Sequence, residues 1–215
     1  MRSRFDEQLA LLNRELIEMG ALCEEVIAAA AKALMEGDTA LAAQIAPRAG
    51  EIDRQERYIE SLCLKLLLQQ QPVARDLRQI SAALKMVTDM ERIGDHAADI
   101  SELTVAMAGT PYKLRGDNIK RMAAETIVML VDAVDSYVTK DMAKARAVID
   151  HDDVVDDLFL KVKADLIQVI RENPEYGEYA ADLLMVNKYL ERIGDHATNL
   201  AEWVIFALDN KGEGE

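Results

Sequence analysis

The sequence is poor in aromatic residues, proline and cysteine, and it has no long apolar run. Only 5% of its 215 residues are aromatic, and it contains four prolines and two cysteines. A composition rich in Ala, Leu and Met favours helix over strand. Its apolar runs fall far short of the roughly 20 residues that span a membrane, and its charged N-terminal segment lacks the apolar core of a secretion signal. We therefore expect a helical, cytoplasmic protein.

Basic residues are also in short supply. Lys and Arg number 25 against 39 Asp and Glu, which gives a formal net charge of -14. A surface that binds nucleic acid needs a clustered excess of basic side chains to neutralise phosphates, so this class of function is excluded. Cys23 and Cys63 have no CxxC spacing and no secretory context, so we expect both to be reduced core residues.

Apolar residues recur at three- and four-residue steps along six segments, which predicts six amphipathic helices. The expected helices cover residues 5–36, 38–71, 75–108, 119–138, 141–172 and 175–208. Pro47 should bend the second helix or delay its regular start. We expect an all-α fold of two tandem three-helix bundles, residues 1–110 and 111–215, with long antiparallel helices. The polar end, 210–215, has no apolar anchor, which predicts disorder.

A repeated heptapeptide supports the two bundles independently. ERIGDHA occurs at 91–97 and again at 191–197, and Leu84 and Leu184 align at the same spacing of 100 residues. The two copies fall on the third and the sixth expected helices. An internal duplication of a whole bundle predicts this placement.

Each copy carries a stripe of acidic side chains. At 100° per residue, Glu91, Asp95, Asp99 and Glu102 share one face, as do Glu191, Asp195, Asn199 and Glu202. Both stripes lie opposite the apolar face of the helix. Like charges four residues apart destabilise a helix by about 0.2–0.5 kcal/mol unless a cation offsets them. The stripes are therefore either solvated faces or parts of cation sites.

Acids from a neighbouring helix could complete such a site. The candidates are Asp53 and Glu56 on the second helix, and Asp152, Asp153 and Asp156 on the fifth. Oxygen donors suit magnesium, manganese or ferric iron better than zinc in a thiolate cage.

The basic residues of the heptapeptides face elsewhere. His96 and His196 turn away from the acids, so we expect histidines at the edge of the core. We expect Arg92 and Arg192 to form exposed ion pairs with an adjacent helix.

No catalytic constellation is present in the sequence. A di-iron bundle enzyme uses Glu-x-x-His pairs, whereas this chain has Glu-x-x-x-Asp. It also lacks a nucleophile elbow, a phosphate-binding glycine loop and a dinucleotide fingerprint. We therefore expect no enzymatic activity. A metal-binding bundle with a metal-dependent enzymatic or storage role is the alternative.

The motifs resemble those of the PhoU family, the phosphate-specific transport system accessory proteins. The resemblance rests on the two heptapeptides, on QQQPVARDLRQI at 69–80 and on ERIGDHATNLAE at 191–202, and it covers nearly the whole chain. It implies two similar three-helix bundles that bind metal ions through Glu/Asp-x-x-x-Asp motifs. The metal would be a divalent or ferric ion, namely iron, manganese, magnesium or zinc.

The family motifs carry over to particular residues of this chain. In the first bundle they imply Asp53, Glu91, Asp95 and Asp99 as metal ligands. In the second they imply Asp152, Asp156, Glu191 and Asp195, with Asn199 in place of a third acid on that helix. One departure concerns the first bundle, where Ala49 stands at the place that Asp152 fills in the second. The two metal sites are therefore expected to differ.

The resemblance also implies a function. Family members repress the phosphate-starvation response and restrain phosphate uptake, by contacting a sensor histidine kinase and the ATPase subunit of the phosphate transporter. This protein would accordingly be a regulatory adaptor. Its long helical faces are suited to a homodimer.

Overall fold

The computed structural model describes residues 2–69, 72–110 and 117–209, and the regular elements of these residues are all helices. The expected disordered tail at 210–215 and part of the expected break between the bundles lie outside them. The helices are α1 (Arg2–Glu36), α2 (Thr39–Ala42), α3 (Ile45–Gln69), α4 (Ala74–Ala106), α5 (Asp117–Thr139), α6 (Met142–Glu172) and α7 (Gly177–Leu208), with a 3-10 turn, η1 (Pro174–Tyr176), before α7.

Aspartate caps begin the second helical segment of each bundle. The Asp38 carboxylate accepts a hydrogen bond from the backbone N–H three residues later at 2.9 Å. Asp141 accepts two, from the N–H groups two and three residues later, at 2.9 and 3.0 Å. Each cap follows a residue with a left-handed backbone, Gly37 with φ 66° and Lys140 with φ 56°. Both bundles therefore use the same turn, and the starts expected at the two aspartates are confirmed.

The second helix begins later than its apolar pattern alone would place it. Residues 39–42 form the single turn α2, and α3 begins at Ile45. Pro47 is the third residue of α3, within the first turn, where its missing N–H group needs no intrahelical partner. The expected delay at Pro47 is confirmed.

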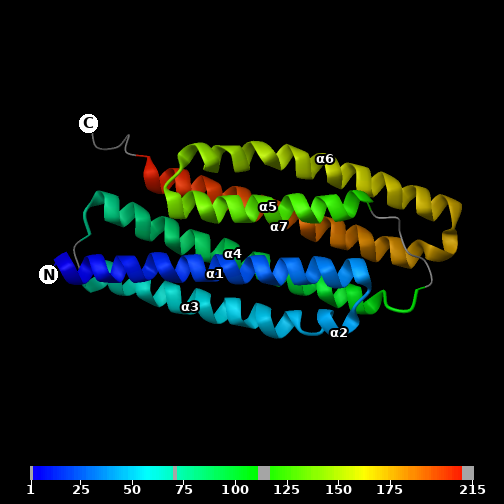
Figure 1. The fold of residues 1–215 in the computed structure, drawn as a ribbon, viewed down its shortest axis with the longest axis horizontal. Coiled ribbons are helices and arrows are strands. Elements are labelled where there is room, and N and C mark those ends of the chain that lie inside the picture. Colours follow the sequence, from blue (N-terminus) through cyan, green and yellow to red (C-terminus); the bar gives the residue numbers. More distant parts are fainter. Residues whose placement is uncertain (1, 70–71, 111–116, 210–215) are drawn as a thin grey trace.

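Six long antiparallel helices form two bundles that lie side by side. The first holds α1, α3 and α4 and the second holds α5, α6 and α7, with α3 and α6 on opposite outer sides (Figure 1). Between the bundles, α4 packs on α7 and α1 packs on α5. None of the described helices has the length and apolar character that a membrane span requires.

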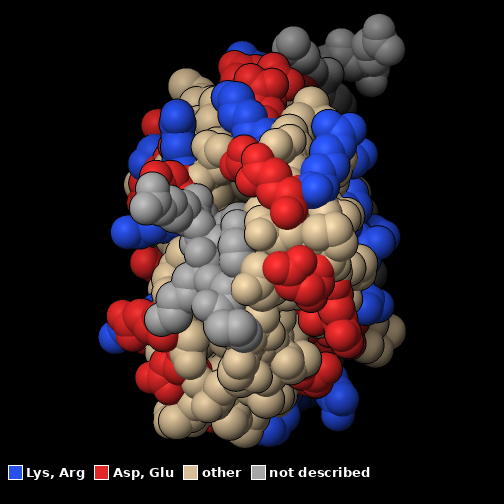
Figure 2. Space-filling view, turned by 90° about the vertical axis from the view of Figure 1, so that its right-hand side faces the viewer, with Lys and Arg blue, Asp and Glu red and all other residues tan. Residues whose placement is uncertain are grey.

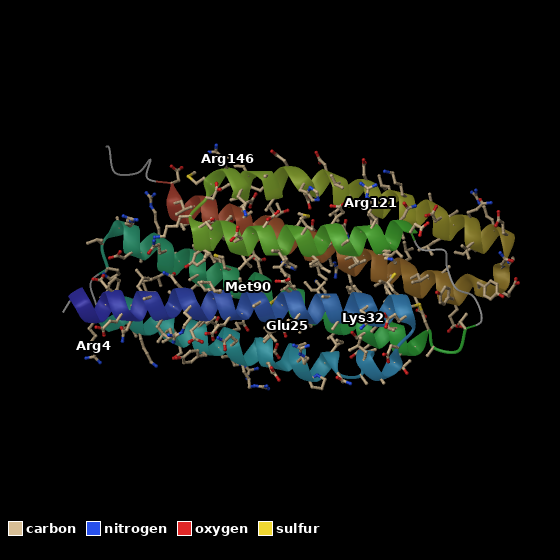
Figure 3. All side chains as sticks on the ribbon, viewed as in Figure 1. Arg4, Glu25, Lys32, Met90, Arg121 and Arg146 are labelled. Carbon is tan, nitrogen blue, oxygen red and sulfur yellow. The ribbon has the colours of Figure 1, made fainter. Side chains whose placement is uncertain are left out.

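One continuous core serves both bundles. Its buried apolar side chains come from all six long helices. Met90 lies among the helices with 1% of its surface exposed, whereas Arg121 and Arg146 point outward (Figure 3). At the end where η1 joins α6 to α7, the described acidic and basic side chains lie interspersed on the surface (Figure 2).

The two heptapeptides use the same positions for packing. Ile93, Gly94 and Ala97 are buried in α4, and the residues at the equivalent positions of α7 are also buried. The acidic positions lie on the other face of each helix. The duplication therefore repeats both a packing face and a polar face.

Close contact between α1 and α5 depends on Gly20. A Cβ atom added there would lie 2.8 and 2.9 Å from the two Cγ atoms of Val134. Real Cβ atoms do not approach other atoms so closely. A β-branched side chain in a helix has one strongly preferred rotamer, so Val134 cannot turn both methyl groups away.

We predict that Gly20→Ala lowers the free energy of unfolding by about 1–2 kcal/mol. The destabilisation by overpacking is larger than the stabilisation from the higher helix propensity of alanine. Urea unfolding followed by circular dichroism would measure the change. Shortening the partner in Gly20→Ala/Val134→Ala should recover part of the loss. A single variant as stable as the wild type would contradict the close approach.

Candidate metal centre

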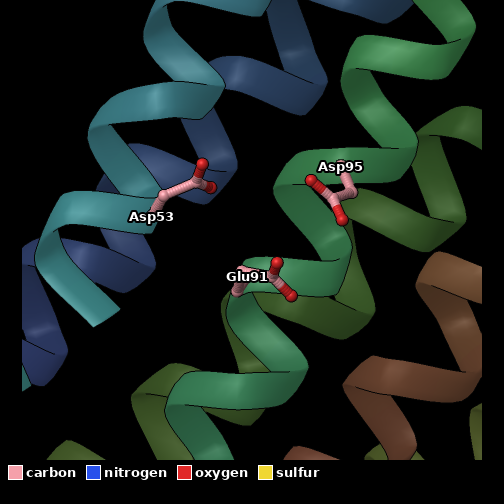
Figure 4. Close-up of side chains that lie close together, drawn as sticks. All are labelled: Asp53, Glu91 and Asp95. Carbon is pink, nitrogen blue, oxygen red and sulfur yellow. The ribbon is translucent and has the colours of Figure 1, made fainter. Parts of the chain in front are cut away.

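Three carboxylates from two helices converge in the first bundle. Glu91 and Asp95 lie one turn apart on α4, and Asp53 faces them from α3 (Figure 4). Each of the three offers one oxygen atom, and these atoms lie within 4.8 Å of one another. All three side chains are half-buried. We call these residues the first acidic cluster.

A close approach of α3 to α4 positions this cluster. A Cβ atom added to Gly94 would lie 2.8 Å from Cδ1 of Ile52, which is fully buried. The glycine therefore lets the isoleucine pack directly against the α4 backbone. Asp53 follows Ile52 in sequence, so the same contact brings its carboxylate beside Glu91.

Repulsion from neighbouring acids and burial both disfavour the charged form of Glu91. Burial is the main cause that raises the pKa of Glu91, and Asp95 and Asp53 raise it further. Arg92 and His196 act in the opposite direction. Arg92 contacts Glu91 at 3.4 Å and Asp95 at 3.3 Å from the solvent side. Arg92 therefore pairs with acids of its own helix. The sequence had led us to expect partners on an adjacent helix.

The donor set fits a hard cation. Carboxylate oxygens at this spacing suit magnesium, manganese or ferric iron, and half-burial leaves room for water to complete the coordination. Glu56 lies near the cluster, since burial and then repulsion from Glu91 raise the pKa of its carboxyl. These residues could hold a metal ion, and Glu56 could contribute a further oxygen.

Asp99 is directed to a different neighbour. Its carboxylate lies 3.5 Å from Nδ1 of His96. The His96 ring stacks on Tyr189 of α7, with 5.4 Å between ring centroids. Asp99 is therefore not one of the three converging carboxylates, and its predicted role as a metal ligand stays a prediction.

The acids of the second bundle, Asp152, Asp156, Glu191 and Asp195, form what we call the second acidic cluster. Burial and then Asp156 and Asp195 raise the pKa of Asp152. Burial and then Glu191 raise that of Asp195. The four are thus neighbours. Within the described part of the chain, however, only the first cluster brings three oxygen atoms within 4.8 Å, and metal binding by the second stays a prediction.

Asn199 takes part in a contact between the bundles. Its side-chain amide donates a hydrogen bond of 3.1 Å to Asp89 on α4. The same Asp89 oxygen lies 2.8 Å from Nδ1 of His196. The structure therefore places Asn199 beside α4 and Asp89, and its predicted role at a metal site stays a prediction.

The two histidines meet where the two bundles join. The rings of His96 and His196 have centroids 5.7 Å apart. His96 contacts Tyr189, and His196 contacts Asp89, which occupies the same place in the first copy. Such reciprocal contacts are typical of a two-fold relation. The histidines lie at the edge of the core, as predicted, and they join the two bundles.

Projecting the helices from the sequence did not identify the functional contacts of the residues just before each heptapeptide, which differ between the two copies. Asp89 corresponds to Tyr189, and Thr88 corresponds to Lys188, just before the heptapeptides. Lys188 Nζ forms an ion pair with Glu191. Comparing the residues that flank the two heptapeptides could have pointed to these positions, because a difference within a repeat marks a difference in surroundings.

The fold and the acidic surface define a class of protein: an all-α pair of similar three-helix bundles, with carboxylates gathered beside the third helix of each. The family model described as the PhoU domain matches residues 16–104 and again 119–204. The chain therefore belongs to the PhoU family, as the motifs predicted. The exact boundary between residues 110 and 111 stays a prediction.

Individual relatives cover nearly the full length of the chain. The phosphate-specific transport system accessory protein PhoU homolog of Clostridium acetobutylicum is 35% identical over 98% of this chain and 96% of its own. The homolog from Rhizobium meliloti is 33% identical over 99% and 91%. The crystal structure of PhoU from Pseudomonas aeruginosa is 31% identical, with a TM-score of 0.91 over 95% of this chain and 98% of that one. The predicted fold is confirmed.

We predict that Glu91→Gln stabilises the metal-free protein at pH 7 by about 0.2–0.5 kcal/mol, the usual effect of removing one like-charge pair on a helix. The folded state raises the pKa of this carboxyl, so ionised Glu91 disfavours folding at neutral pH. The wild type recovers this loss as the pH falls through the folded pKa, and the difference should shrink by about pH 4.5.

Urea unfolding in EDTA at both pH values would measure the difference. Glu102→Gln, on the exposed face of the same helix, is the matched control and should show a smaller effect. A Glu91→Gln variant that is less stable than the wild type at pH 7 would contradict the prediction.

Proposed function

We propose that the protein is a regulatory adaptor of phosphate homeostasis. It restrains phosphate uptake and represses the phosphate-starvation response by binding a sensor histidine kinase and the ATPase subunit of the phosphate transporter. The observation that carries this proposal is the similarity, along nearly the whole chain, to proteins named accessory proteins of the phosphate-specific transport system. Such an adaptor works in the cytoplasm, at the inner face of the membrane.

The outer helices offer contact surface for such partners. On α3, Leu64 and Leu68 lie one turn apart with 54% and 85% of their surfaces exposed, and on α6 Leu160 is 59% exposed. Exposed apolar side chains amid charged ones are common where proteins bind one another. They support a protein-binding role on both sides of the molecule. A homodimer could use the same faces, and homodimerisation stays a prediction.

Deleting the gene should raise expression from a phosphate-starvation promoter in phosphate-rich medium, because the kinase would lose its repressor. Expression of the wild-type chain should restore repression. A tagged chain should also retain the kinase and the transporter ATPase in a pull-down, and a tagged acidic helical protein of unrelated sequence should retain neither. Unchanged promoter activity in the deletion strain together with an empty pull-down would contradict the proposal.

The first acidic cluster is proposed as a metal site of this regulator. Asp53 belongs to α3, whereas Glu91 and Asp95 belong to α4, so the three residues would hold an ion between two helices. A bound cation would neutralise the mutual repulsion of their carboxylates. Its chemical contribution would be charge and cross-linking, which stabilise the first bundle.

Asp53→Asn/Glu91→Gln should lose the bound metal and keep the helical content of the wild type, because these side chains lie outside the apolar core. Elemental analysis after purification without chelator or affinity-column metal would measure this, with Mn²⁺ titration calorimetry as a second readout. Glu102→Gln also replaces a carboxylate by an amide, but elsewhere on α4, and it should leave the metal content unchanged. Equal metal content in all three proteins would show that the cluster only faces solvent.

The alternative of a metal-dependent enzyme can be separated by turnover. Phosphatase and oxidase assays on the metal-loaded protein should give no activity above that of Asp53→Asn/Glu91→Gln. Turnover that depends on Glu91 would favour the enzymatic alternative over the adaptor.

A further inference from the structure

The second acidic cluster is contacted by a cation from the chain itself. Lys188 lies one helical turn before Glu191 on α7, and its ammonium group donates a hydrogen bond to Oε2 of that carboxylate. It also acts electrostatically on Asp195. The ammonium lies 5.6 Å from the centre of the Phe159 ring on α6, a distance typical of a cation–π contact. Lys188 is therefore held between the two helices that supply the cluster.

The first acidic cluster has no counterpart of this lysine. The equivalent residue is Thr88, which is exposed and whose hydroxyl donates to the backbone carbonyl of Leu84. Arg92 does reach the first cluster, at 3.3 and 3.4 Å, but it does so from α4 alone, with 55% of its side chain exposed against 40% for Lys188. A metal ion can displace such a partner more easily than one held between two helices.

The carboxylates of the two clusters differ accordingly. Within the described residues, Asp53 and Asp95 converge with Glu91 to bring three oxygen atoms within 4.8 Å, whereas their counterparts Asp156 and Asp195 form no such group of three. Glu191 is one of the four acids of this cluster, so Lys188 contacts a carboxylate that a metal ion there would also use. An ammonium group and a metal ion cannot hold the same oxygen without one weakening the other.

We propose that Lys188 is the built-in counter-ion of the second acidic cluster, so that the wild-type protein binds metal in its first bundle and fills the equivalent place in its second bundle with its own ammonium group. This inference rests on the proposed metal role of the first cluster. It adds that the residue three positions before the first glutamate of each heptapeptide, Thr88 in one copy and Lys188 in the other, decides which bundle takes up a metal ion.

Exchange of these two residues tests the proposal. Wild type, Lys188→Thr, Thr88→Lys and the double exchange Thr88→Lys/Lys188→Thr would be titrated with Mn²⁺ by calorimetry, with circular dichroism to confirm that each is folded. We expect the wild type to bind one ion, Lys188→Thr two and Thr88→Lys none. The double exchange should bind one ion that is lost with Glu191→Gln and retained with Glu91→Gln.

A second measurement needs no metal. In EDTA, Lys188→Thr should melt about 1–3 °C below the wild type, because the second cluster loses its cation. Adding Glu191→Gln to this variant should recover part of the loss. These results would support the lysine as counter-ion even if the wild type bound no metal. In that case only the proposed metal role of the first cluster would fail.

Two results would overturn the inference. One is a wild type that binds two ions of similar affinity, which would leave the metal role of the first cluster standing. The other is a Lys188→Thr variant with the melting temperature and metal stoichiometry of the wild type.

Discussion

The packing of α4 against α7 is the contact on which the rest of the structure depends. Each helix contributes one copy of the same buried face. In α4 this face includes Gly94, which lets Ile52 of α3 approach closely. The two helices run antiparallel, and α3 and α6 lie on opposite outer sides (Figure 1). The histidines of α4 and α7 meet where these two helices pack. A single repeated heptapeptide thereby sets the core, the junction of the bundles and the place of both acidic clusters.

Gathering carboxylates beside this junction costs free energy unless a cation is present, and the two bundles meet this constraint differently. In the first, the acids converge and are half-buried, and Arg92 approaches them from solvent. In the second, Lys188 is held between α6 and α7 and contacts Glu191 directly. The two copies therefore share the acids at 91 and 191 and at 95 and 195, whereas the residues just before the heptapeptides differ, as Thr88 and Lys188 do.

Much of this arrangement could be predicted from the sequence, and the limits have a physical cause. Apolar periodicity located the six long helices. Asp38 and Asp141 marked the starts of α2 and α6, because a cap acts through local hydrogen bonds. Projection also placed Glu91 and Asp95 on one face. It could not show which helix lies opposite that face, so the contacts of Asp99 and Asn199 were not foreseen. Those contacts depend on how two whole bundles pack.

The first acidic cluster and the junction of the bundles form one electrostatic unit. His196 belongs to α7, yet it partly offsets the rise in the pKa of Glu91 on α4. It also contacts Asp89, which accepts a hydrogen bond from Asn199. A change of charge at the cluster therefore acts on His196 in a partly buried setting, where screening by solvent is reduced. The charge of the first acidic cluster can thus affect a side chain that joins the two bundles.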